Sequence, residues 1–473
     1  MTMDEQIKKR FIEVVGIKNI KLTQAQLLAY SYDATANFQA KPDLVISPKN
    51  IDEIIEIVKL CSKERIPIVS RGSGTNLAAG TVPTQGGIVL LFNRMNQILE
   101  LDTENLTITV QPGVITQDIS NYVEMHGFFY PPDPSSMKIS TIGGNVSENS
   151  GGLRGLKYGV TKDYVRALTT VLPDGSVLKT GGKLAKDVAG YDLNSLLVGS
   201  EGTLGIITEI TLKLIPLPVH KKTGIAYFNS LEDAAETVSA IIANKIIPVT
   251  LEFMDRGTMD AVEEFMKLGL PKDADAMLLM EQDGDIELVE RDLQLMIDIA
   301  IEKGAKATAI AASVEEADLL KTGRRSALSA LSRKRPTTIL EDATVPRSEI
   351  ANMVRSIQTI ALKYNVQIST FGHAGDGNLH PTCLTDIRDH EEMERVEQAL
   401  AEIFEVAISL GGTITGEHGV GEMKAPYLEW KLGESGIQLM KQIKQAIDPL
   451  NIMNPGKIFA KEKKMRVVIH HGE

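Results

Sequence analysis

Short apolar segments alternate with glycine-rich loops over the first two hundred residues, and this alternation limits the possible folds more than any other feature of the chain. Residues 44–46 and 67–70 are typical of buried strands, and Asn50 is a predicted N-cap for a helix that runs to about Glu64. The loop 71–76 follows the second strand directly. Glycine permits positive φ and close approach of a ligand to the backbone. We therefore expect a scaffold of strands and helices whose loops present bare backbone to a ligand.

The glycine loops do not fit the two common nucleotide-binding motifs. Leu77 occupies the last glycine position of G-x-G-x-x-G, and Gly182-Lys183 is not followed by Ser or Thr. A plain turn is the alternative interpretation of loop 71–76 alone. Comparable loops follow at 131–135, 141–145, 149–152, 157–159 and 199–205. Several loops that bring backbone N–H groups to one surface predict a large, extended ligand that carries phosphate.

Further strands are predicted at 87–92, 106–110 and 204–214, with a hairpin turn at Pro173-Asp174-Gly175. After Pro216 and Pro218 the pattern changes to strand, helix, strand. This order occurs at 224–228, 231–244 and 249–254, and again at 276–281, 286–303 and 305–312. Two such units predict a small ferredoxin-like α+β domain, and a chance succession of elements is the alternative.

Composition excludes several classes of protein. The 473 residues suggest two or three domains, and the net charge of -12, with both signs interspersed, argues against nucleic acid as the main partner. Cys61 and Cys383 give no disulfide framework and fit a reducing compartment. The first ten residues lack a secretory signal, and no run approaches the roughly 20 apolar residues of a membrane span. We expect a cytoplasmic protein without a transmembrane anchor.

Histidines and carboxylates gather in two glycine-rich segments of the C-terminal half. Residues 372–380 contain His373 and His380, and residues 416–419 contain Glu417 and His418. Two imidazoles and one carboxylate suit a divalent ion such as zinc, iron or manganese and leave positions open for a substrate oxygen, while His418 is free to move a proton. We expect both segments to be loops. For the H-x6-H spacing alone, a structural turn is the alternative.

Six of these segments together resemble the FAD-linked oxidases of the vanillyl-alcohol oxidase superfamily, within the group of the glycolate oxidase D-subunit, D-lactate dehydrogenase and D-2-hydroxyglutarate dehydrogenase. They are Arg71-Gly72-Ser73-Gly74-Thr75, Pro132-Asp133-Pro134, Thr141-Ile142-Gly143-Gly144-Asn145, the glycine loop 199–205, the histidine segment 373–380 and Asn454-Pro455-Gly456-Lys457. The resemblance covers about residues 41–459. It implies an α+β fold with a two-subdomain FAD-binding domain of the vanillyl-alcohol oxidase type at 1–218. A ferredoxin-like substrate (cap) domain carrying the metal site would span 219–425, and a C-terminal segment, 426–473, would return to the FAD domain.

The resemblance also implies which residues bind FAD. In this family the first loop and the segment 141–145 hold the pyrophosphate, and the segment 199–205 lies along the adenine and ribose. The residues carried over are Arg71, Gly72, Ser73, Gly74, Thr75, Asn76, Pro132, Asp133, Ser135, Thr141, Gly143, Gly144, Asn145, Gly151, Gly152, Tyr158, Gly159, Glu201, Gly202, Gly205, Ile206 and Asn454. Some relatives attach FAD covalently through a histidine in the first loop. Thr75 and Asn76 stand there in this chain, so noncovalent FAD is predicted.

For the chemistry, the resemblance implies that His373, His380 and Glu417 ligate a divalent metal, that His418 is the catalytic base and that Arg324 holds the substrate carboxylate. Hydroxyglutarate-specific members have a lysine where this chain has Leu340, which disfavours a second substrate carboxylate. We expect oxidation of a D-2-hydroxy acid, D-lactate to pyruvate first among them, with glycolate and D-2-hydroxyglutarate as alternatives.

Two other functions stay open from the sequence, together with the identity of the electron acceptor. A metal-dependent hydrolase or lyase could use the same histidines and carboxylate and would be colourless. A pure electron-transfer subunit would not need the complete set of candidate catalytic residues. The chain has no cysteine cluster for its own iron–sulfur relay. Reduced flavin must therefore pass electrons to an external acceptor, such as an electron-transfer flavoprotein or an iron–sulfur subunit.

Overall fold

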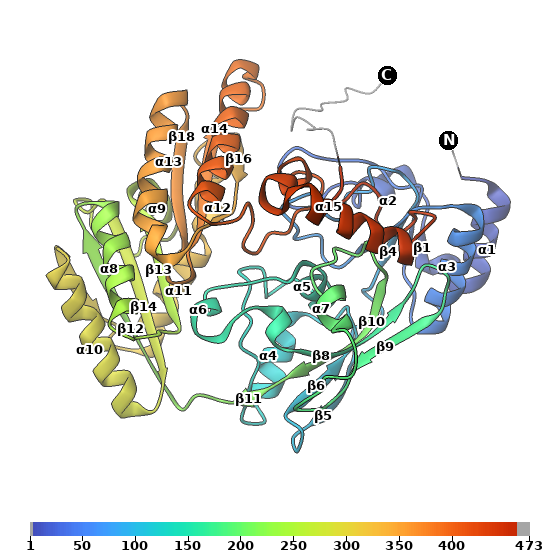
Figure 1. Ribbon diagram of the computed structural model, residues 1–473, viewed down its shortest axis with the longest axis horizontal. Helices are drawn as coiled ribbons and strands as arrows, with labels where there is room; N and C mark the ends of the chain where they lie inside the picture. The colour runs from blue at the N-terminus through green and yellow to red at the C-terminus, as the bar shows by residue number, and fades with distance from the viewer. Residues whose placement is uncertain (1–2, 461–473) are drawn as a thin grey trace. The chain divides into compact units, whose positions relative to one another are not determined.

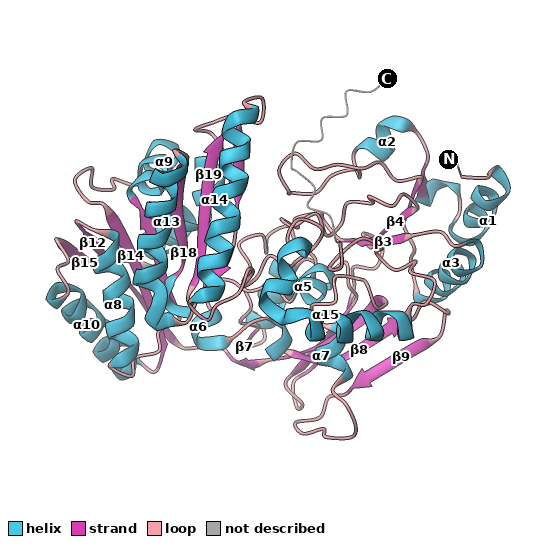
Figure 2. Cartoon of the chain, turned by 45° about the horizontal axis from the view of Figure 1, so that its top comes forward, coloured by secondary structure: helices cyan, strands magenta, loops and turns pink. Residues whose placement is uncertain are grey.

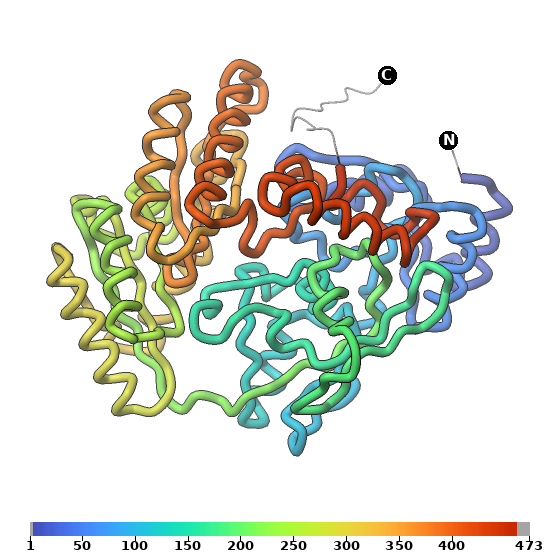
Figure 3. The backbone as a smooth tube through the Cα atoms, viewed as in Figure 1, coloured from blue at the N-terminus to red at the C-terminus, as the bar shows by residue number. Residues whose placement is uncertain are grey.

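The computed structural model describes residues 3–460 and divides into two compact units. The first unit contains the chain up to Ser150, Val160–Leu217 and the chain from Glu417 onward, while the second contains Gly151–Gly159 and Pro218–Gly416. These boundaries lie close to the predicted ones at 218 and 425. Two differences stand out: residues 151–159 group with the second unit, and the C-terminal return, red in Figure 3, starts at Glu417.

The first unit contains two main sheets, labelled in Figure 1. A four-stranded sheet has the order β1-β2-β4-β3, in which β4 pairs in parallel with both β2 and β3. A five-stranded antiparallel sheet has the order β5-β6-β10-β8-β9, and β7 pairs with β11. The strands are β1 (Ile20–Lys21), β2 (Leu44–Ile46), β3 (Ile68–Arg71), β4 (Ile88–Leu91), β5 (Ile98–Asp102), β6 (Thr107–Val110), β7 (Phe128–Phe129), β8 (Val165–Val171), β9 (Val177–Gly181), β10 (Ile206–Lys213) and β11 (Ile215–Pro216). The predicted hairpin turn is confirmed between β8 and β9, where Gly175 has φ +84°.

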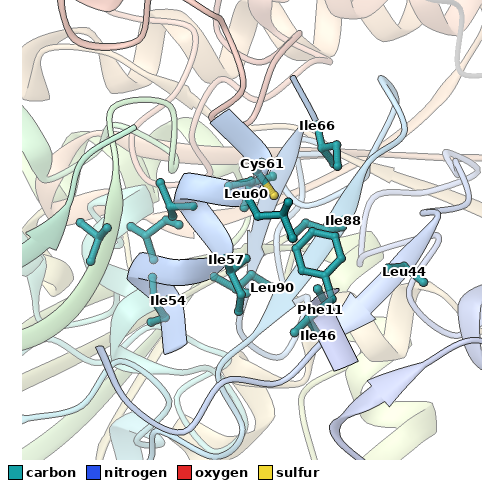
Figure 4. Close-up of a cluster of buried hydrophobic side chains, with 14 of the residues drawn as sticks. Phe11, Leu44, Ile46, Ile54, Ile57, Leu60, Cys61, Ile66, Ile88 and Leu90 are labelled. Atoms are coloured by element: carbon teal, nitrogen blue, oxygen red, sulfur yellow. The ribbon is translucent and has the colours of Figure 1, made fainter. Parts of the chain in front are cut away.

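Helices of the first unit cover these sheets and bury an apolar core (Figure 4). The predicted helix is confirmed as α3 (Ile51–Glu64), whose N-cap Asn50 accepts a hydrogen bond from Glu53 N at 3.0 Å, a cap that contributes about 1 kcal/mol. Phe11 of α1 (Glu5–Val15) is fully buried against Ile57, and such a side chain contributes roughly 1.5–3 kcal/mol. The other helices are α2 (Gln24–Leu28), α4 (Thr116–Glu124), α5 (Ile142–Glu148), α7 (Leu193–Leu197) and α15 (Leu428–Ile447).

The C-terminal return adds chain to the edge of the four-stranded sheet. Ile68 N donates a hydrogen bond to Ile452 O at 2.7 Å, and Asn454 N donates to Ile68 O at 2.8 Å. Lys444 of α15 is buried and donates to Thr203 O at 2.8 Å while it pairs with Asp448. Burial lowers the pKa of Lys444. The return is therefore fixed by both backbone pairing and a buried charge pair.

The second unit is built on one large antiparallel sheet, and its first four strands have the predicted ferredoxin-like order. They are β12 (His220–Phe228), β13 (Thr250–Asp255), β14 (Ala276–Gly284) and β15 (Ala307–Ile310), arranged as β15-β12-β14-β13. Three more strands continue the sheet as β18-β19-β16, with β17 beside β19. They are β16 (Thr337–Leu340), β17 (Ala343–Thr344), β18 (Gln367–His373) and β19 (Asn378–Thr385).

Two groups of helices pack on this sheet. Figure 2 shows α10, α8, α13 and α14 in a row along it, each packed on the next. The helices α9, α11 and α12 pack together, and side chains from α9 and α12 bury Met254, Leu279 and Phe371 of the sheet. The bounds are α6 (Gly155–Tyr158), α8 (Leu231–Ala243), α9 (Arg256–Met266), α10 (Ile286–Glu302), α11 (Val314–Arg325), α12 (Ala327–Leu331), α13 (Ile350–Tyr364) and α14 (His390–Ser409). Among residues 3–460, no helix combines the length and apolarity needed to cross a membrane.

The histidine segment 372–380 is a β-hairpin, so the expectation of a loop was wrong there. His373 ends β18, and Asn378 begins β19 opposite it. The turn between them is short because Gly377 adopts φ +84°, at a position where a Cβ would lie 2.1 Å from Val345 O. The glycines thus make a tight turn inside a sheet, which holds the flanking histidines rigidly.

Candidate active site

Two of the loops predicted to hold FAD lie against each other in the first unit. A Cβ added to Gly72 would lie 2.1 Å from Thr141 Oγ1, so only glycine permits this approach. An open pocket lies beside the contact, lined in part by Arg71 and by five of the predicted cofactor glycines, Gly72, Gly143, Gly144, Gly202 and Gly205. Glycine loops that are separate in the sequence thus form one surface in the fold.

The pocket carries groups that attract an anion. Thr141 is the N-cap of α5 and accepts a hydrogen bond from Gly144 N at 3.4 Å, while Ile142 N and Gly143 N donate to Val114 O and Pro112 O, both at 2.8 Å. The guanidinium of Arg71 also lies here, and burial lowers the pKa of Arg71. The positive end of the helix dipole and the guanidinium of Arg71 together favour a phosphate group here.

Several predicted cofactor residues use their side chains to shape these loops. Asn76 Oδ1 accepts from the N–H groups of Ala78 at 2.9 Å and Gly80 at 2.6 Å, and Asn145 Nδ2 donates to Thr116 Oγ1 at 2.6 Å. The remaining predicted positions in this part are Ser73, Gly74 and Thr75 of the first loop, Pro132, Asp133 and Ser135 of the loop after β7, and Ile206 at the start of β10. Asn76 Oδ1 and Asn145 Nδ2 therefore brace these loops.

Glu201, predicted to lie along the adenine and ribose, holds protein backbone instead. Its Oε1 accepts from Val420 N and its Oε2 from Gly421 N, both at 2.7 Å. Asn454, another predicted cofactor residue, donates from Nδ2 to Glu201 O at 2.6 Å and to Gly80 O at 2.9 Å. Glu201 and Asn454 therefore fasten the C-terminal return, just after Glu417 and His418, to the first unit.

The predicted cofactor residues Gly151, Gly152, Tyr158 and Gly159 belong to the second unit. Tyr158 Oη donates to both carboxylate oxygens of Asp283 at 2.9 Å, and Lys157 Nζ lies 2.5 Å from Asp283 Oδ1. These contacts attach the short segment around α6 to the end of β14. The tyrosine hydroxyl consequently has a structural partner that the sequence did not indicate.

The predicted metal ligands come together. One ligand atom each from His373, His380 and Glu417 lie within 4.8 Å of one another, and both histidines are buried. Strand pairing explains why the two histidines share one face of the sheet. Phe371 of β18 is paired with His380 of β19, and His373 is paired with Asn378. Paired residues and residues two apart on a strand project to the same side, so both imidazoles do as well. The two rings lie edge to face with centroids 5.1 Å apart. This set could hold a divalent ion.

Arg324, the predicted carboxylate-binding residue, lies beside the histidines through a shared partner. Glu252 of β13 is paired in register with His373, and its Oε1 lies 2.7 Å from His373 Nδ1. Its Oε2 lies 2.7 Å from Arg324 Nε, in the last turn of α11. The guanidinium also covers Phe371, with Cζ 4.7 Å from the ring centroid. Arg324 is 2% exposed and Glu252 is 0% exposed, so this is a fully buried charge pair.

The segment that carries Glu417 and His418 is held on both sides. Asp342 Oδ2 accepts hydrogen bonds from Thr415 Oγ1 at 2.7 Å and from Gly416 N at 2.8 Å, within the second unit. On the other side Glu201 holds Val420 and Gly421. His418 Nε2 lies 3.9 Å from Glu417 Oε1, and its side chain is 9% exposed. The predicted base is thus a largely buried imidazole on a fixed segment.

Glu252 and Asp342 were not among the predicted site residues. Glu252 had a detectable signal, since a carboxylate in the middle of the apolar strand Thr250–Asp255 must have a partner to be buried. No pattern in the sequence marked Asp342, because two acidic residues directly after a strand are typical of an ordinary polar turn. Glu252 contacts the predicted ligand His373, and Asp342 holds Gly416, the residue before the predicted ligand Glu417; both act from distant positions in the sequence.

Comparison with known proteins gives the family. Residues 217–458 match the family of FAD linked oxidases, C-terminal domain, and residues 42–181 match an FAD binding domain. The chain belongs to the FAD-linked oxidases. It is 63% identical over 464 residues to the glycolate oxidase subunit GlcD of Bacillus subtilis, covering 98% of this chain and 99% of the relative. It is 37% identical over 441 residues to a D-lactate dehydrogenase of Anaerostipes hadrus, covering 91% and 92%.

Solved structures agree with this family at the level of fold. This FAD-linked oxidase superposes on p-cresol methylhydroxylase with a TM-score of 0.80 and 19% identity, covering 96% of each chain. The likeness confirms the predicted α+β fold class of the vanillyl-alcohol oxidase type. Membership of an FAD-dependent oxidoreductase family also decides against the hydrolase and lyase alternatives.

Proposed function

We propose that this FAD-linked oxidase oxidises a short 2-hydroxy acid, glycolate or D-lactate, to the 2-oxo acid. The buried cluster of Arg324, Glu252, His373 and His380 on one face of a rigid sheet carries this proposal. It joins an anion-binding guanidinium to imidazoles suited to a substrate hydroxyl. The relatives named glycolate oxidase subunit and D-lactate dehydrogenase support the same pair of substrates.

FAD, when bound, supplies the two-electron acceptor for the hydrogen on the substrate α-carbon. Arg71, the N-terminus of α5 and the glycines at 72, 143, 144, 202 and 205 would hold its pyrophosphate. Neither Thr75 nor Asn76 can form the histidyl bond that some relatives use, which supports noncovalent attachment. The protein contributes position and charge rather than the redox chemistry itself.

Three residues of the chain would bind the acid and move its proton. Arg324 binds the carboxylate, because a guanidinium offers paired N–H groups to two carboxylate oxygens. Its Nη2 is buried and has no hydrogen-bond partner within residues 3–460, which supports a role in binding an anion. His418 accepts the hydroxyl proton as general base. Burial of Arg324 keeps water away from the guanidinium.

His373, His380 and Glu417 fit a divalent ion by donor type and by their mutual distances. Such an ion supplies Lewis acidity that lowers the pKa of the substrate hydroxyl. Zinc, iron and manganese all accept two imidazoles and one carboxylate. The hydrogen bond between Glu252 and His373 Nδ1 is typical of a metal-binding histidine and supports the assignment.

Substrate size is the finer part of the proposal. Leu340 lies half-buried and packs against the apolar cluster that includes Phe371. The side chain at position 340 is therefore apolar and does not supply a cation for a second substrate carboxylate. Glycolate and lactate differ by one methyl group, and such a difference changes discrimination by only about 1–3 kcal/mol. We therefore expect both acids to react, with different rates.

The external acceptor is part of the proposal. The 63% identical relative is named as a subunit of glycolate oxidase, which supports a protein partner for electron transfer. An iron–sulfur subunit or an electron-transfer flavoprotein has the required chemistry, since each accepts electrons from a reduced flavin.

The deciding experiment is the visible absorption spectrum of the purified protein before and after anaerobic addition of glycolate, D-lactate or L-lactate. We expect flavin bands that bleach with the first two acids and persist with the third. Arg324→Lys should bleach only at much higher acid concentration, while Arg355→Lys, an exposed arginine on α13, should behave as the unmodified protein. A bound flavin that neither glycolate nor D-lactate reduces would contradict the proposed substrate class.

A further inference from the structure

We propose that Glu252 is a positioning residue that links metal binding to recognition of the substrate carboxylate. This inference rests on the proposed function, because it concerns the ligand His373 and the substrate-binding Arg324. One carboxylate serves both partners: Oε1 lies 2.7 Å from His373 Nδ1, and Oε2 lies 2.7 Å from Arg324 Nε. Each oxygen has its own partner.

The fold brings this trio together from three separate elements. Glu252 and His373 are cross-strand neighbours on β13 and β18, and their side chains therefore project to the same face. Arg324 reaches that face from the last turn of α11, where a positive charge is favoured by the helix dipole. Side-chain exposures of 0%, 4% and 2% for Glu252, His373 and Arg324 exclude solvent from the contacts.

The hydrogen bond fixes the histidine tautomer. A carboxylate beside a guanidinium only accepts hydrogen bonds, so Nδ1 of His373 is the donor. Nε2 then carries the lone pair and is the atom available to a metal ion. Glu252 therefore determines which nitrogen of His373 serves as ligand and how the ring is oriented.

The same carboxylate orients the arginine. Nε lies against Glu252 and Cζ lies 4.7 Å from the ring centroid of Phe371, so the guanidinium of Arg324 is held by two contacts. Nη2 has no hydrogen-bond partner within residues 3–460. A fixed guanidinium loses less freedom on binding an anion than a mobile one. Glu252 thus prepares the site for a carboxylate as well as for a metal.

A buried carboxylate on the neighbouring strand provides a matched control. Glu281 of β14 lies 2.7 Å from Lys321 of α11 and accepts from Thr223 Oγ1 at 2.8 Å. Glu281→Gln therefore disturbs a buried ion pair between the same sheet and the same helix. This variant leaves all contacts of His373 and Arg324 in place. Comparing it with Glu252→Gln therefore separates an effect on stability from an effect on the positions of His373 and Arg324.

The test compares Glu252→Gln with Glu281→Gln as FAD-loaded proteins. A glutamine side chain has one acceptor oxygen and one NH2 group. In Glu252→Gln the NH2 group must therefore face one of the two donors, His373 Nδ1 or Arg324 Nε, and that contact is lost. We expect Glu252→Gln to weaken Co²⁺ binding, titrated by its visible absorption, at least 10-fold, and to raise KM for glycolate or D-lactate at least 10-fold. Glu281→Gln should change neither value. Equal effects of the two variants, or unchanged Co²⁺ affinity and KM in Glu252→Gln, would overturn the inference.

Two further measurements keep the test independent of folding and of the proposed function. If Glu252→Gln does not fold, Arg324→Met replaces it, and we expect a several-fold tighter binding of Co²⁺ because Glu252, without a cation beside it, then serves His373 alone; unchanged affinity would overturn the link. Co²⁺ titration needs no turnover, so it reports on Glu252 even if neither acid reduces the flavin. Unmodified protein that binds no Co²⁺ would overturn the inference directly, whatever its activity.

Discussion

At the scale of single residues, the site depends on buried charges that each have a specific partner. Glu252 joins Arg324 to His373, Asp342 holds Gly416, and Glu201 holds Val420 and Gly421. Burying such charges is unfavourable unless they are paired, and removal of one partner typically costs about 3–5 kcal/mol. These pairs are therefore sensitive positions for mutation.

His418→Asn should lower the rate of flavin reduction by the hydroxy acid roughly 100-fold or more, because asparagine cannot accept the substrate proton. The rate is measured by rapid mixing without oxygen, after FAD content has been shown to be normal. His126→Asn is the control, since that histidine is exposed and bonds only to Tyr122 O in its own turn. A rate for His418→Asn within a few-fold of the unmodified protein would reject its role as base.

At the scale of elements, glycine loops and helix caps position the chemistry. The Gly72 and Thr141 loops meet at a distance that excludes a side chain, and α5 begins at this contact. In the second unit, α9 begins at its N-cap Asp255, whose Oδ1 accepts from Thr258 N at 2.8 Å while Oδ2 accepts from Thr370 N at 2.6 Å. The contact between Gly72 and Thr141 leads to a prediction about FAD binding, and the cap at Asp255 leads to a prediction about stability.

Gly72→Ala should weaken FAD binding about 10-fold or more. The new Cβ would lie 2.1 Å from Thr141 Oγ1, so one loop must move away from the pyrophosphate site, and such overpacking costs about 1–3 kcal/mol. Titration of the FAD-free protein with FAD measures the affinity. Gly182→Ala is the control, because its Cβ would meet only Leu184 Cγ at 3.6 Å. Unchanged affinity in Gly72→Ala would show that the loop contact does not shape the FAD site.

The cap of α9 predicts a pH dependence of stability. Burial raises the pKa of Asp255 to about 6 from an ordinary 3.8, so the folded protein holds this proton more tightly than the unfolded chain. The stabilising contribution is complete below about pH 4 and is lost as the pH rises through 6. Asp255→Asn should remove that decline from urea-unfolding curves taken between pH 4 and 7. Asp298→Asn, an exposed carboxylate on α10, should retain it; the same slope in Asp255→Asn would assign the decline to other groups.

At the scale of the whole molecule, the chain forms two units, and each contains one buried cysteine. Cys61 lies in the core of the first unit, and Cys383 lies in β19 of the second. Burial raises the pKa of both thiols, that of Cys383 to about 12, so neither reacts while its unit is folded. Each cysteine is therefore a reporter of the opening of one unit.

FAD should protect Cys61 more than Cys383 from a thiol reagent near the unfolding temperature. A ligand at about 100 times its Kd stabilises the unit that binds it by about 2.7 kcal/mol, which slows labelling through unfolding about 100-fold. The rates are compared in Cys383→Ala, which retains Cys61, and in Cys61→Ala, which retains Cys383. Equal protection of both thiols would indicate that the two units open together.

The sequence by itself determined the local elements, the family, and the residue types of the site. The caps, the glycine turns and the alternation of apolar residues are local properties, so α3, the β8–β9 hairpin and the ferredoxin-like order were predictable. Tertiary structure decided the partners: Glu252 with His373 and Arg324, Asp342 with Gly416, and Glu201 with the C-terminal return. These pairs join positions about 70 to 220 residues apart, and strand register and packing fix them rather than any local preference of the chain.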